Sequence, residues 1–451
     1  MSVFEVLMAT NTSEAFEYIS MYVLKFEIIF GVSIYLLFLF SIYNYIERFN
    51  FVKKYIYVTI GIVMIYVVMG TGISYAMHRH MKWQDTVNFV RAIRMGKYAY
   101  RDLKQYEIML HGNTGEDIVI TRNEDSIPYV IYILGESTSR NHQSLYGYEL
   151  ETTPRLDNMK REGDIHVFTD VVSPHSHTMP VLEKLFTFYR KGAGGNWYEY
   201  NNIFDVLKKA GVNTAWISNQ ESSGVYGNAG RVYASKCDIG EFTLIRDSMS
   251  EIMEPYDEAL FPYIDDALKK AKLRNFYVFH LMGTHGRYSS RYPDIDQWRK
   301  FDEEVEIGKN EQWKQIRAEY DNAILYNDYI VTEIINKFKD KDAIIIFTSD
   351  HGEEVYDERD YAGHDEINGS RWMIEIPMFI YTSPKFRINH PEKEKAITEA
   401  VDRPYMTDDM IHTLLDIMDI ETDEYHSNCS IINKNFDVKR ERVYAGKIYE
   451  K

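Results

Sequence analysis

The 451-residue sequence predicts an α/β domain in which a mostly parallel sheet lies between helices, preceded by an N-terminal transmembrane helical segment. Long runs without charged residues occur near the N-terminus. From about residue 125, short apolar runs rich in β-branched residues alternate with helical patterns. The short runs are continuously apolar, which is typical of strands buried on both faces and therefore of parallel sheets. Strands that alternate with helices favour an α/β sandwich.

Two segments have the length and composition of membrane spans. Residues 55–77 contain no charged side chain over 23 positions, which is enough for a helix to cross a hydrocarbon core of about 30 Å. Residues 22–46 form the second candidate, with Lys25 and Glu27 near one end. The alternative for both is a pair of buried core helices.

These patterns divide the chain into a transmembrane region of about two spans (1–78), a juxtamembrane connector (79–120) and an α/β metal-dependent catalytic domain (121–451). The connector is basic and partly apolar. This composition fits either a helix on an anionic membrane surface or a helix packed on the next domain.

The distribution of basic residues bears on orientation. Counted simply, the five Lys and Arg residues between Arg79 and Lys97 would place the C-terminal domain in the cytoplasm, although long domains are exported despite such a bias. Residues 1–20 contain no Lys or Arg and hence no signal-peptide n-region. We expect further membrane helices to precede this chain.

Charge and cysteine content exclude some classes of protein. The formal net charge of −17 argues against a nucleic-acid partner, because such proteins usually present a basic face. The two cysteines, Cys237 and Cys429, are too few for a disulfide framework or a cysteine-rich zinc site. Isolated thiols are favoured over a single bridge.

Polar residues follow three of the predicted strands directly. Glu136 follows "YVIYILG", His285 follows "FYVFHLMGT", and Asp350 and His351 follow "AIIIFTS". Ligands of open α/β sheets bind beyond the carboxyl ends of the strands, so we expect these side chains to meet. Taken singly, each residue could instead cap a turn.

Glu136, Asp350 and His351 form an oxygen, oxygen and nitrogen donor set that suits Zn²⁺ or Mn²⁺. Three protein ligands leave a coordination position open for a nucleophile. Thr178 stands in "SPHSHTMP", just before a predicted helix over 181–188. Zinc lowers the pKa of bound water from about 15.7 to about 7, and an alcohol should respond in the same direction.

Other interpretations of this segment remain open. Thr178 could cap the helix, and this role is compatible with catalysis. Ser176 is the alternative nucleophile. His175 and His177 could bind metal as a pair on one extended face, although surface or supporting roles are favoured over metal binding.

The segments "GESTSR", "SPHSHTMP", "HLMGTHG" and "SDHGEEVYDERDYAGH" resemble the membrane-anchored phosphoethanolamine transferases. These are inner-membrane members of the alkaline phosphatase/sulfatase superfamily that modify lipopolysaccharide. The resemblance covers essentially the whole C-terminal domain. It implies an alkaline phosphatase/sulfatase-like fold. It also implies that the chain is anchored in the bacterial inner membrane, with its catalytic domain in the periplasm. That family usually has five transmembrane helices, whereas two are visible here.

Carried over residue by residue, the resemblance implies a zinc site with a nucleophile and supporting groups. The implied zinc ligands are Glu136, Thr178, Asp350 and His351, and Thr178 is also the nucleophile. His285 and His364 are implied to contact the phosphoryl group or a second metal. Thr10 and Glu14 are implied to contact the donor headgroup. The sequence departs from the family in two ways. The disulfides frequent in the lipid A branch cannot form, and a lysine expected near "SNQESSGVYGN" is absent, so Asn219, Gln220 or Ser223 would bind substrate there.

The implied reaction is zinc-dependent transfer of phosphoethanolamine from phosphatidylethanolamine, through a threonine ester, with release of diacylglycerol. The acceptor is lipopolysaccharide (core or lipid A) or a related cell-envelope glycan, and "EVYDERDYAGH" is closer to the branch acting on core. Glycerophosphate transfer, phosphodiester hydrolysis and a non-catalytic membrane-anchored binding protein are the alternatives. Sulfatase activity is not expected, because neither C-x-P-x-R nor S-x-P-x-R stands at the nucleophile.

Overall fold

The computed structural model describes residues 37, 40, 115–124, 127–221, 229–244, 255–302 and 310–451. The chain divides into two compact units, residues 1–103 and 104–451, and all elements named below belong to the second. Apart from Leu37 and Phe40, the predicted spans lie outside the described residues. None of the helices that are described has the length and apolar composition needed to cross a membrane. The transmembrane segment and the domain boundaries therefore stay predictions.

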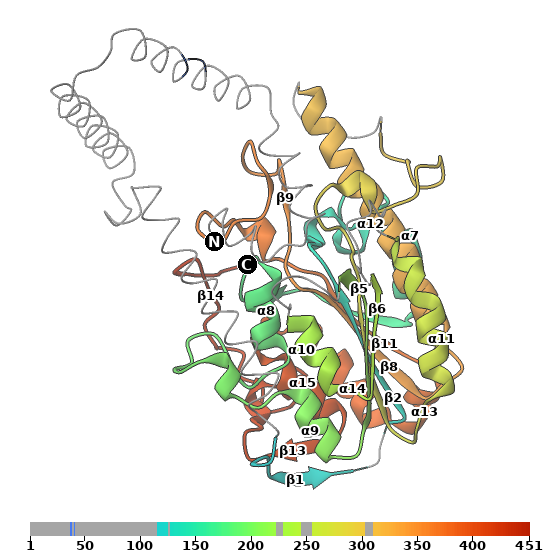
Figure 1. The fold of residues 1–451 in the computed structure, drawn as a ribbon, viewed down its shortest axis with the longest axis vertical. Coiled ribbons are helices and arrows are strands. Elements are labelled where there is room, and N and C mark those ends of the chain that lie inside the picture. Colours follow the sequence, from blue (N-terminus) through green and yellow to red (C-terminus); the bar gives the residue numbers. More distant parts are fainter. Residues whose placement is uncertain are drawn as a thin grey trace, which may run out of the picture. The chain divides into compact units, whose positions relative to one another are not determined.

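A seven-stranded sheet forms the centre of the second unit, in the order β3-β11-β8-β2-β7-β5-β6 (Figure 1). Its strands are β2 (Tyr129–Gly135), β3 (Ile165–Phe168), β5 (Asn213–Glu221), β6 (Ile239–Leu244), β7 (Asn275–His280), β8 (Ala343–Ser349) and β11 (Met378–Thr382). Strand β11 runs antiparallel to both of its neighbours, and every other pair in the sheet is parallel. The prediction of a mostly parallel sheet is confirmed.

The central strands are buried on both faces, as their continuous apolar runs predict. Every residue of β7, β8 and β11 is buried, and so is all of β2 except Tyr129. Successive side chains of β2 enter two different cores. Tyr132 packs in one hydrophobic cluster, whereas Ile131 and Ile133 pack in the other.

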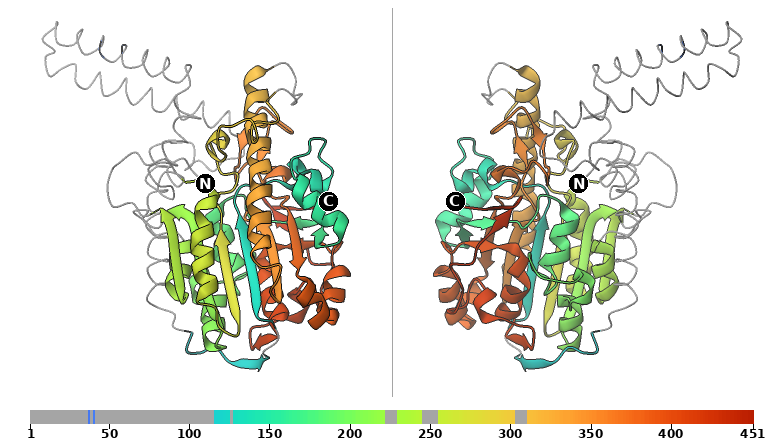
Figure 2. Two further views of the ribbon diagram at one scale, coloured as in Figure 1. Left: turned by 90° about the vertical axis from the view of Figure 1, so that its right-hand side faces the viewer. Right: turned by 90° about the vertical axis from the view of Figure 1, so that its left-hand side faces the viewer.

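Helices cover both faces of the sheet (Figures 1 and 2). One layer consists of α8 (Thr178–Leu185), α9 (Ile203–Lys209), α10 (Ala229–Lys236), α13 (Pro384–Asn389), α14 (Pro391–Thr398) and α15 (Met410–Ile417). The opposite layer consists of α7 (Pro154–Glu162), α11 (Phe261–Lys269) and the long α12 (Glu311–Asn336). The three layers confirm the predicted sandwich.

Short strand pairs surround the main sheet. They are β1 (Ile120–Asn123) with β13 (Ile420–Thr422), β4 (Val171–Val172) with β12 (Tyr405–Met406), β9 (Glu354–Val355) with β10 (Ala362–Gly363), and β14 (Val443–Tyr444) with β15 (Lys447–Ile448). The pair β9–β10 matters most for the site, because it follows Asp350 and His351 and leads to His364.

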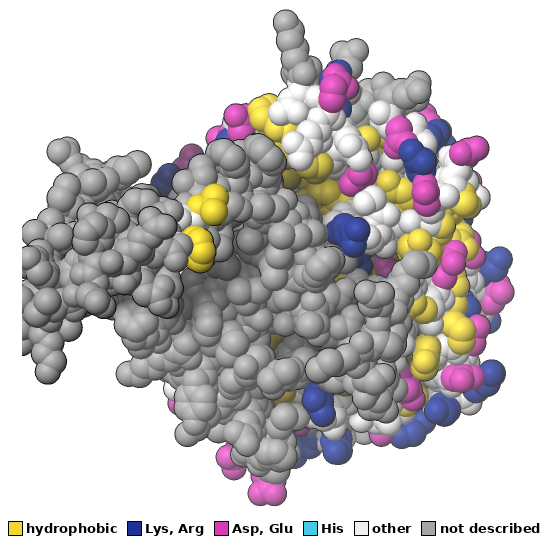
Figure 3. All heavy atoms as spheres, turned by 45° about the horizontal axis from the view of Figure 1, so that its top comes forward, with side chains coloured by type: hydrophobic (Ala, Val, Ile, Leu, Met, Phe, Trp, Pro, Cys, Tyr) yellow, Lys and Arg dark blue, Asp and Glu magenta, His cyan; other side chains and the backbone are white. Residues whose placement is uncertain are grey.

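The surface and the cysteines agree with the composition of the chain. On the face drawn in Figure 3, the visible described residues intermix Lys and Arg with Asp, Glu and apolar side chains. Cys237 and Cys429 are both free thiols, so the prediction of isolated cysteines is confirmed.

His142 ties the loop after β2 to helix α12 through buried charges. Its Nδ1 lies 2.8 Å from Asp321 Oδ1, and its Nε2 lies 3.1 Å from Asp357 Oδ1. Burial alone would lower the pKa of His142, but the two carboxylates outweigh it and raise the pKa to about 9. The charged imidazole therefore stabilises the fold.

We expect this stabilisation to be fully present below pH 6.5 and to be lost as the pH rises through 9, because the folded-state pKa exceeds the unfolded value. His142→Gln cannot titrate. The difference in unfolding free energy between wild type and variant should shrink by up to about 3 kcal/mol between pH 6 and pH 10. Urea unfolding at both pH values measures it, and an unchanged difference would contradict a charged His142.

Candidate active site

The register of the sheet places two acidic residues side by side. Strands β2 and β8 are parallel, and Gly135 pairs with Ser349, the last residue of each strand. Glu136 and Asp350 follow immediately, and the Asp350 backbone N–H donates to the Gly135 carbonyl over 3.0 Å. The predicted meeting of these strand ends is thus realised, with Glu136 only 1% exposed and Asp350 fully buried.

The loop after β7 packs directly on Glu136. The Thr284 backbone N–H donates to the Glu136 carbonyl over 3.1 Å. Gly283 has φ +54°, and a Cβ there would lie 2.9 Å from both the backbone N and O of Glu136. Only glycine permits this approach. It brings His285 near the site, where the charge of His285 helps to lower the pKa of the Glu136 carboxyl.

Thr178 is the first residue of α8. The helix begins three residues before the predicted run, and Pro180 is accommodated in its first turn, where a missing N–H costs nothing. The Thr178 hydroxyl donates to both Glu136 carboxylate oxygens at 3.2 Å. Thr178 is partly exposed, whereas the carboxylates of Glu136 and Asp350 are buried.

Two buried atoms of this cluster lack a hydrogen-bond partner, Asp350 Oδ2 and His351 Nε2. His351 Nδ1 lies 2.8 Å from the Gly352 carbonyl, which can only accept, so Nδ1 carries the proton. In the neutral ring the Nε2 lone pair is then free, 3.3 Å from Glu136 Oε1 and 3.5 Å from Asp350 Oδ2. A histidine held in this way is typical of metal ligands. Glu136, Asp350 and His351 therefore fit a divalent cation, with Thr178 beside them.

The pKa values of these three side chains also indicate that the site favours a bound positive charge. Burial and the charge of Glu136 raise the pKa of the Asp350 carboxyl to about 8. Burial opposes protonation of His351, but Asp350 and Glu136 outweigh it and raise the pKa to about 10. Burial likewise opposes ionisation of Glu136, but contact with His351 and the charges of His351 and His285 hold its pKa well below the usual range.

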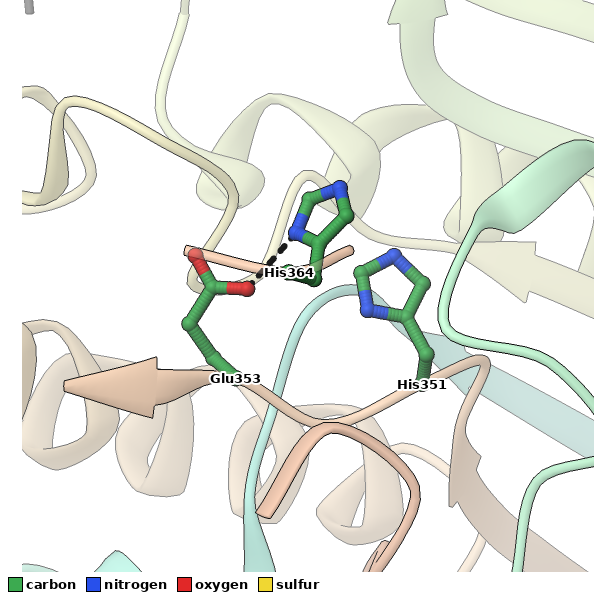
Figure 4. Close-up of side chains that lie close together, drawn as sticks. All are labelled: His351, Glu353 and His364. Atoms are coloured by element: carbon green, nitrogen blue, oxygen red, sulfur yellow. Dashed lines mark hydrogen bonds and ion pairs between the residues drawn. The ribbon is translucent and has the colours of Figure 1, made fainter. Parts of the chain in front are cut away.

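A second group of side chains adjoins the first. His351, Glu353 and His364 lie close enough together to hold an ion, and Figure 4 shows the two imidazoles near each other with Glu353 bonded to His364. The ring centroids of the two histidines are 4.3 Å apart. Glu353 Oε2 lies 2.7 Å from His364 Nδ1, and Tyr288 OH donates to Glu353 Oε1 over 2.6 Å. This leaves His364 Nε2 available to a substrate.

The remaining predicted residues lie in several places. The Asn219 amide donates to Asp257 Oδ1 and to the Pro255 carbonyl, so both of its hydrogens are engaged in a loop contact. It is the Gln220 amide that reaches Glu136, at 3.3 Å from Oε2. A substrate role for Asn219 stays a prediction. Thr10, Glu14 and Ser223 lie outside the described residues.

The two histidines before Thr178 have different surroundings. His175 Nδ1 lies 2.7 Å from Glu366 Oε1, whereas the His177 ring lies 4.9 Å from the His364 ring. Glu353, Glu366 and Tyr320 are not among the residues predicted from the sequence. Glu353 could have been found from its place in "SDHGE". Tyr320 and Glu366 contact the site only through the tertiary fold.

Comparison with known proteins gives this geometry a family. The family described as "Sulfatase" matches residues 128–420. The chain is 30% identical over 477 residues to phosphoethanolamine transferase EptC of Escherichia coli O18:K1:H7, covering 100% of this chain and 80% of that protein. It is 30% identical over 331 residues to phosphoethanolamine transferase CptA of Salmonella typhimurium, covering 71% and 56%.

Solved structures agree. The C-terminal periplasmic domain of EptC from Escherichia coli, in complex with Zn, aligns with a TM-score of 0.66 and 29% identity over 72% of this chain and 92% of that one. The integral membrane protein lipooligosaccharide phosphoethanolamine transferase A from Neisseria meningitidis aligns with a TM-score of 0.63 over 95% and 80%; at 20% identity it supports the fold alone.

A sulfatase-family match over all seven strands of the main sheet and 30% identity to EptC along the whole chain lead to one assignment. The chain belongs to the phosphoethanolamine transferases of the alkaline phosphatase/sulfatase superfamily.

Proposed function

We propose that the chain transfers phosphoethanolamine from phosphatidylethanolamine to lipopolysaccharide, or to a related envelope glycan, through an ester on Thr178, with release of diacylglycerol. The observation that carries this proposal is the Thr178 hydroxyl, held 3.2 Å from Glu136 beside Asp350 and His351. Relatives named EptC, CptA and Kdo(2)-lipid A phosphoethanolamine 7''-transferase support the transferred group and the class of acceptor.

Zinc is the cofactor that the donor set favours, with Mn²⁺ as the alternative. Glu136, Asp350 and His351 would hold it with Thr178, and the zinc complex of the related EptC domain supports the choice of metal. When bound, the ion supplies Lewis-acid chemistry, lowering the pKa of an alcohol and stabilising charge on phosphoryl oxygens.

The side chains of the chain itself account for the bond changes. The Thr178 hydroxyl first gives up its proton to solvent water. Its Oγ attacks phosphorus, the new P–O bond forms, and the P–O bond to diacylglycerol breaks. The leaving alkoxide takes a proton from the imidazolium of His364 or His285. An acceptor hydroxyl then loses its proton to the same imidazole and attacks phosphorus. The P–O bond to Thr178 breaks, and Thr178 Oγ regains a proton from solvent water. Glu353 keeps the His364 ring oriented during both steps.

We also propose that the chain is anchored in the bacterial inner membrane with its catalytic domain in the periplasm. Support comes from the apolar runs 22–46 and 55–77 and from the related EptC structure, which is described as a C-terminal periplasmic domain. Anchoring would keep the enzyme on the surface that holds both lipid substrates.

Incubation of the purified chain with phosphatidylethanolamine should add the mass of one phosphoethanolamine, because the ester accumulates when no acceptor is present. Intact-mass spectrometry measures the adduct, and Thr178→Ala should abolish it. A glycerophosphate adduct from phosphatidylglycerol would instead identify a different donor. Turnover without any adduct would contradict the threonine intermediate.

Asp350→Ala should remove bound zinc and, with it, nearly all activity, because the buried set loses one of its charged ligands. Elemental analysis of wild type and variant measures the metal. Asp342→Ala is the matched control, since Asp342 also adjoins β8 but bonds Asn389 and His390, away from the site. Metal-free wild type would favour a non-catalytic binding protein.

His364→Gln should reduce kcat by about 100- to 10,000-fold, the usual contribution of a general acid. The variant keeps a polar side chain but cannot deliver a proton. A donor whose leaving alcohol has a low pKa tests whether His364 acts as the general acid, because such an alcohol leaves without being protonated. If His364→Gln slows that donor equally, His364 does not act as the acid.

A further inference from the structure

A carboxylate that the proposed chemistry does not use joins the two loops that carry the reacting groups. Glu366 lies in the loop after β10, two residues beyond His364, and its partners lie in the segment just before Thr178. This contact connects parts of the chain that are 191 residues apart in sequence.

Both oxygens of Glu366 are engaged with the segment before the nucleophile. Oε1 accepts from His175 Nδ1 over 2.7 Å. Oε2 accepts from the Ser176 backbone N–H over 2.9 Å and from the Ser176 hydroxyl over 3.1 Å. Three donors on one carboxylate fix the backbone two residues before Thr178, because hydrogen bonds to an ionised acceptor are shorter and stronger than neutral ones.

The carboxylate is ionised in this setting. Burial would raise the pKa of the Glu366 carboxyl, but the hydrogen bonds from His175 and the Ser176 N–H and the charge of Lys191 lower it to about 2. Lys191 itself is held in place, since its Nζ donates to the Pro174 carbonyl.

The loop that carries Glu366 packs against the C-terminal segment. Tyr444 OH donates to the Asp365 carbonyl over 3.3 Å. A Cβ at Gly369 would overlap the Tyr444 hydroxyl, so the loop and the C-terminal strand β14 are in close contact. On the other side, Tyr361 OH donates to the His364 carbonyl over 2.9 Å. The loop that carries Glu366 is therefore held in place by hydrogen bonds from Tyr361 and Tyr444.

The consequence for the site is geometric. Between Ser176 and Thr178 stands His177, whose ring lies 4.9 Å from the His364 ring and 6.4 Å from the His351 ring. Fixing Ser176 against Glu366 thus fixes both Thr178 and His177 relative to the loop that holds His364. A shift of about 1 Å between reacting groups can cost about 100-fold in rate.

We propose that Glu366 is a positioning residue that sets the Thr178 hydroxyl relative to His364 for the transfer step. This inference rests on the proposed function, since it assumes that Thr178 is the nucleophile. Glu366 contacts neither of the two reacting side chains in this arrangement and acts through His175 and Ser176.

The test is Glu366→Gln in the full-length chain, assayed with phosphatidylethanolamine. A glutamine keeps the size of the side chain, but its amide NH₂ meets a donor if it faces the Ser176 N–H. If it faces His175 instead, the ring must move its proton to Nε2, a buried atom without a hydrogen-bond partner among the described residues. We expect the rate of Thr178 adduct formation in a single turnover to fall about 10- to 100-fold. The donor KM and the bound zinc should change less than about two-fold, because no proposed metal ligand is touched.

Glu394→Gln is the matched control. Glu394 Oε1 lies 2.8 Å from His166 Nε2, and its side chain is 21% exposed, against 27% for Glu366. This second carboxylate–histidine pair joins α14 to β3, away from the site, so its loss should leave the rate of adduct formation unchanged. A similar fall in both variants would point to general destabilisation and would overturn the inference.

A double-mutant cycle with His175→Ala separates positioning from a direct role. Because both changes act through one contact, the double variant should be no slower than Glu366→Gln. If the rate reductions of the two single variants instead multiply in the double variant, the inference is overturned. If Glu366→Gln does not fold, His175→Ala decides alone, with a predicted three- to ten-fold fall in rate at unchanged KM. A wild-type rate in either single variant would also overturn it, whereas a wild type that forms no adduct would instead refute the proposed function.

Discussion

Two carboxylates and an imidazole buried at the end of one sheet set the main constraint on this molecule. Glu136, Asp350 and His351 are at most 1% exposed, and their oxygen and nitrogen atoms face one another. Such negative charge is costly to bury without compensation. The compensation is either protons, which explains the raised pKa values of Asp350 and His351, or a divalent cation. Metal and protons therefore compete for the same atoms, as is general for sites of this kind.

The pairing of the strands brings these charged side chains together, and neighbouring elements hold the loops that carry them. Parallel pairing of β2 and β8 leaves no freedom in the spacing of Glu136 and Asp350. Tyr320, on the long helix α12, donates from its hydroxyl to the Ser137 carbonyl over 2.8 Å and accepts from the Ser139 N–H over 2.9 Å. The loop after Glu136 is thereby held from the opposite helical layer. Thr178 enters the site from the start of a helix rather than from a strand end of the main sheet, which is why the position of its loop needs separate support.

The sequence was a good guide to the strands and to the acidic cluster for one reason. Continuous apolar runs report burial on both faces, and the first polar residue after each run marks the strand end, as at Glu136 and Asp350. The edge strands β3 and β6 were not predicted, since partly exposed positions such as His166 and Glu241 interrupt their apolar pattern. The antiparallel direction of β11 was equally hidden, because its residues are as fully buried as those of a parallel strand.

Side-chain partnerships between distant loops could not be predicted in the same way. Nothing near Glu366 in sequence indicates that it bonds His175, and the choice between Asn219 and Gln220 depends on which neighbour turns toward Glu136. Both depend on loop conformations that only the assembled sheet defines. The family resemblance supplied the catalytic set but gave no information on these supporting contacts.

A second buried cluster shows why residue types alone do not make a metal site. Asp409, His412 and Cys429 also lie within reach of one another. There, however, Arg190 and Arg440 donate to Asp409 Oδ2 and already supply the positive charge. His412 Nδ1 accepts the His426 backbone N–H, so the proton of the neutral ring is on Nε2.

His351 has the opposite arrangement. Its Nδ1–H is bonded to a carbonyl, its Nε2 is bare, and no arginine bonds Glu136 or Asp350 among the contacts of the described residues. What distinguishes the catalytic cluster is therefore the hydrogen bond on the far side of the histidine and the missing counter-charge. Those two features, more than the identity of the ligands, make this end of the sheet a place for a cation and for the phosphoryl chemistry that a cation supports.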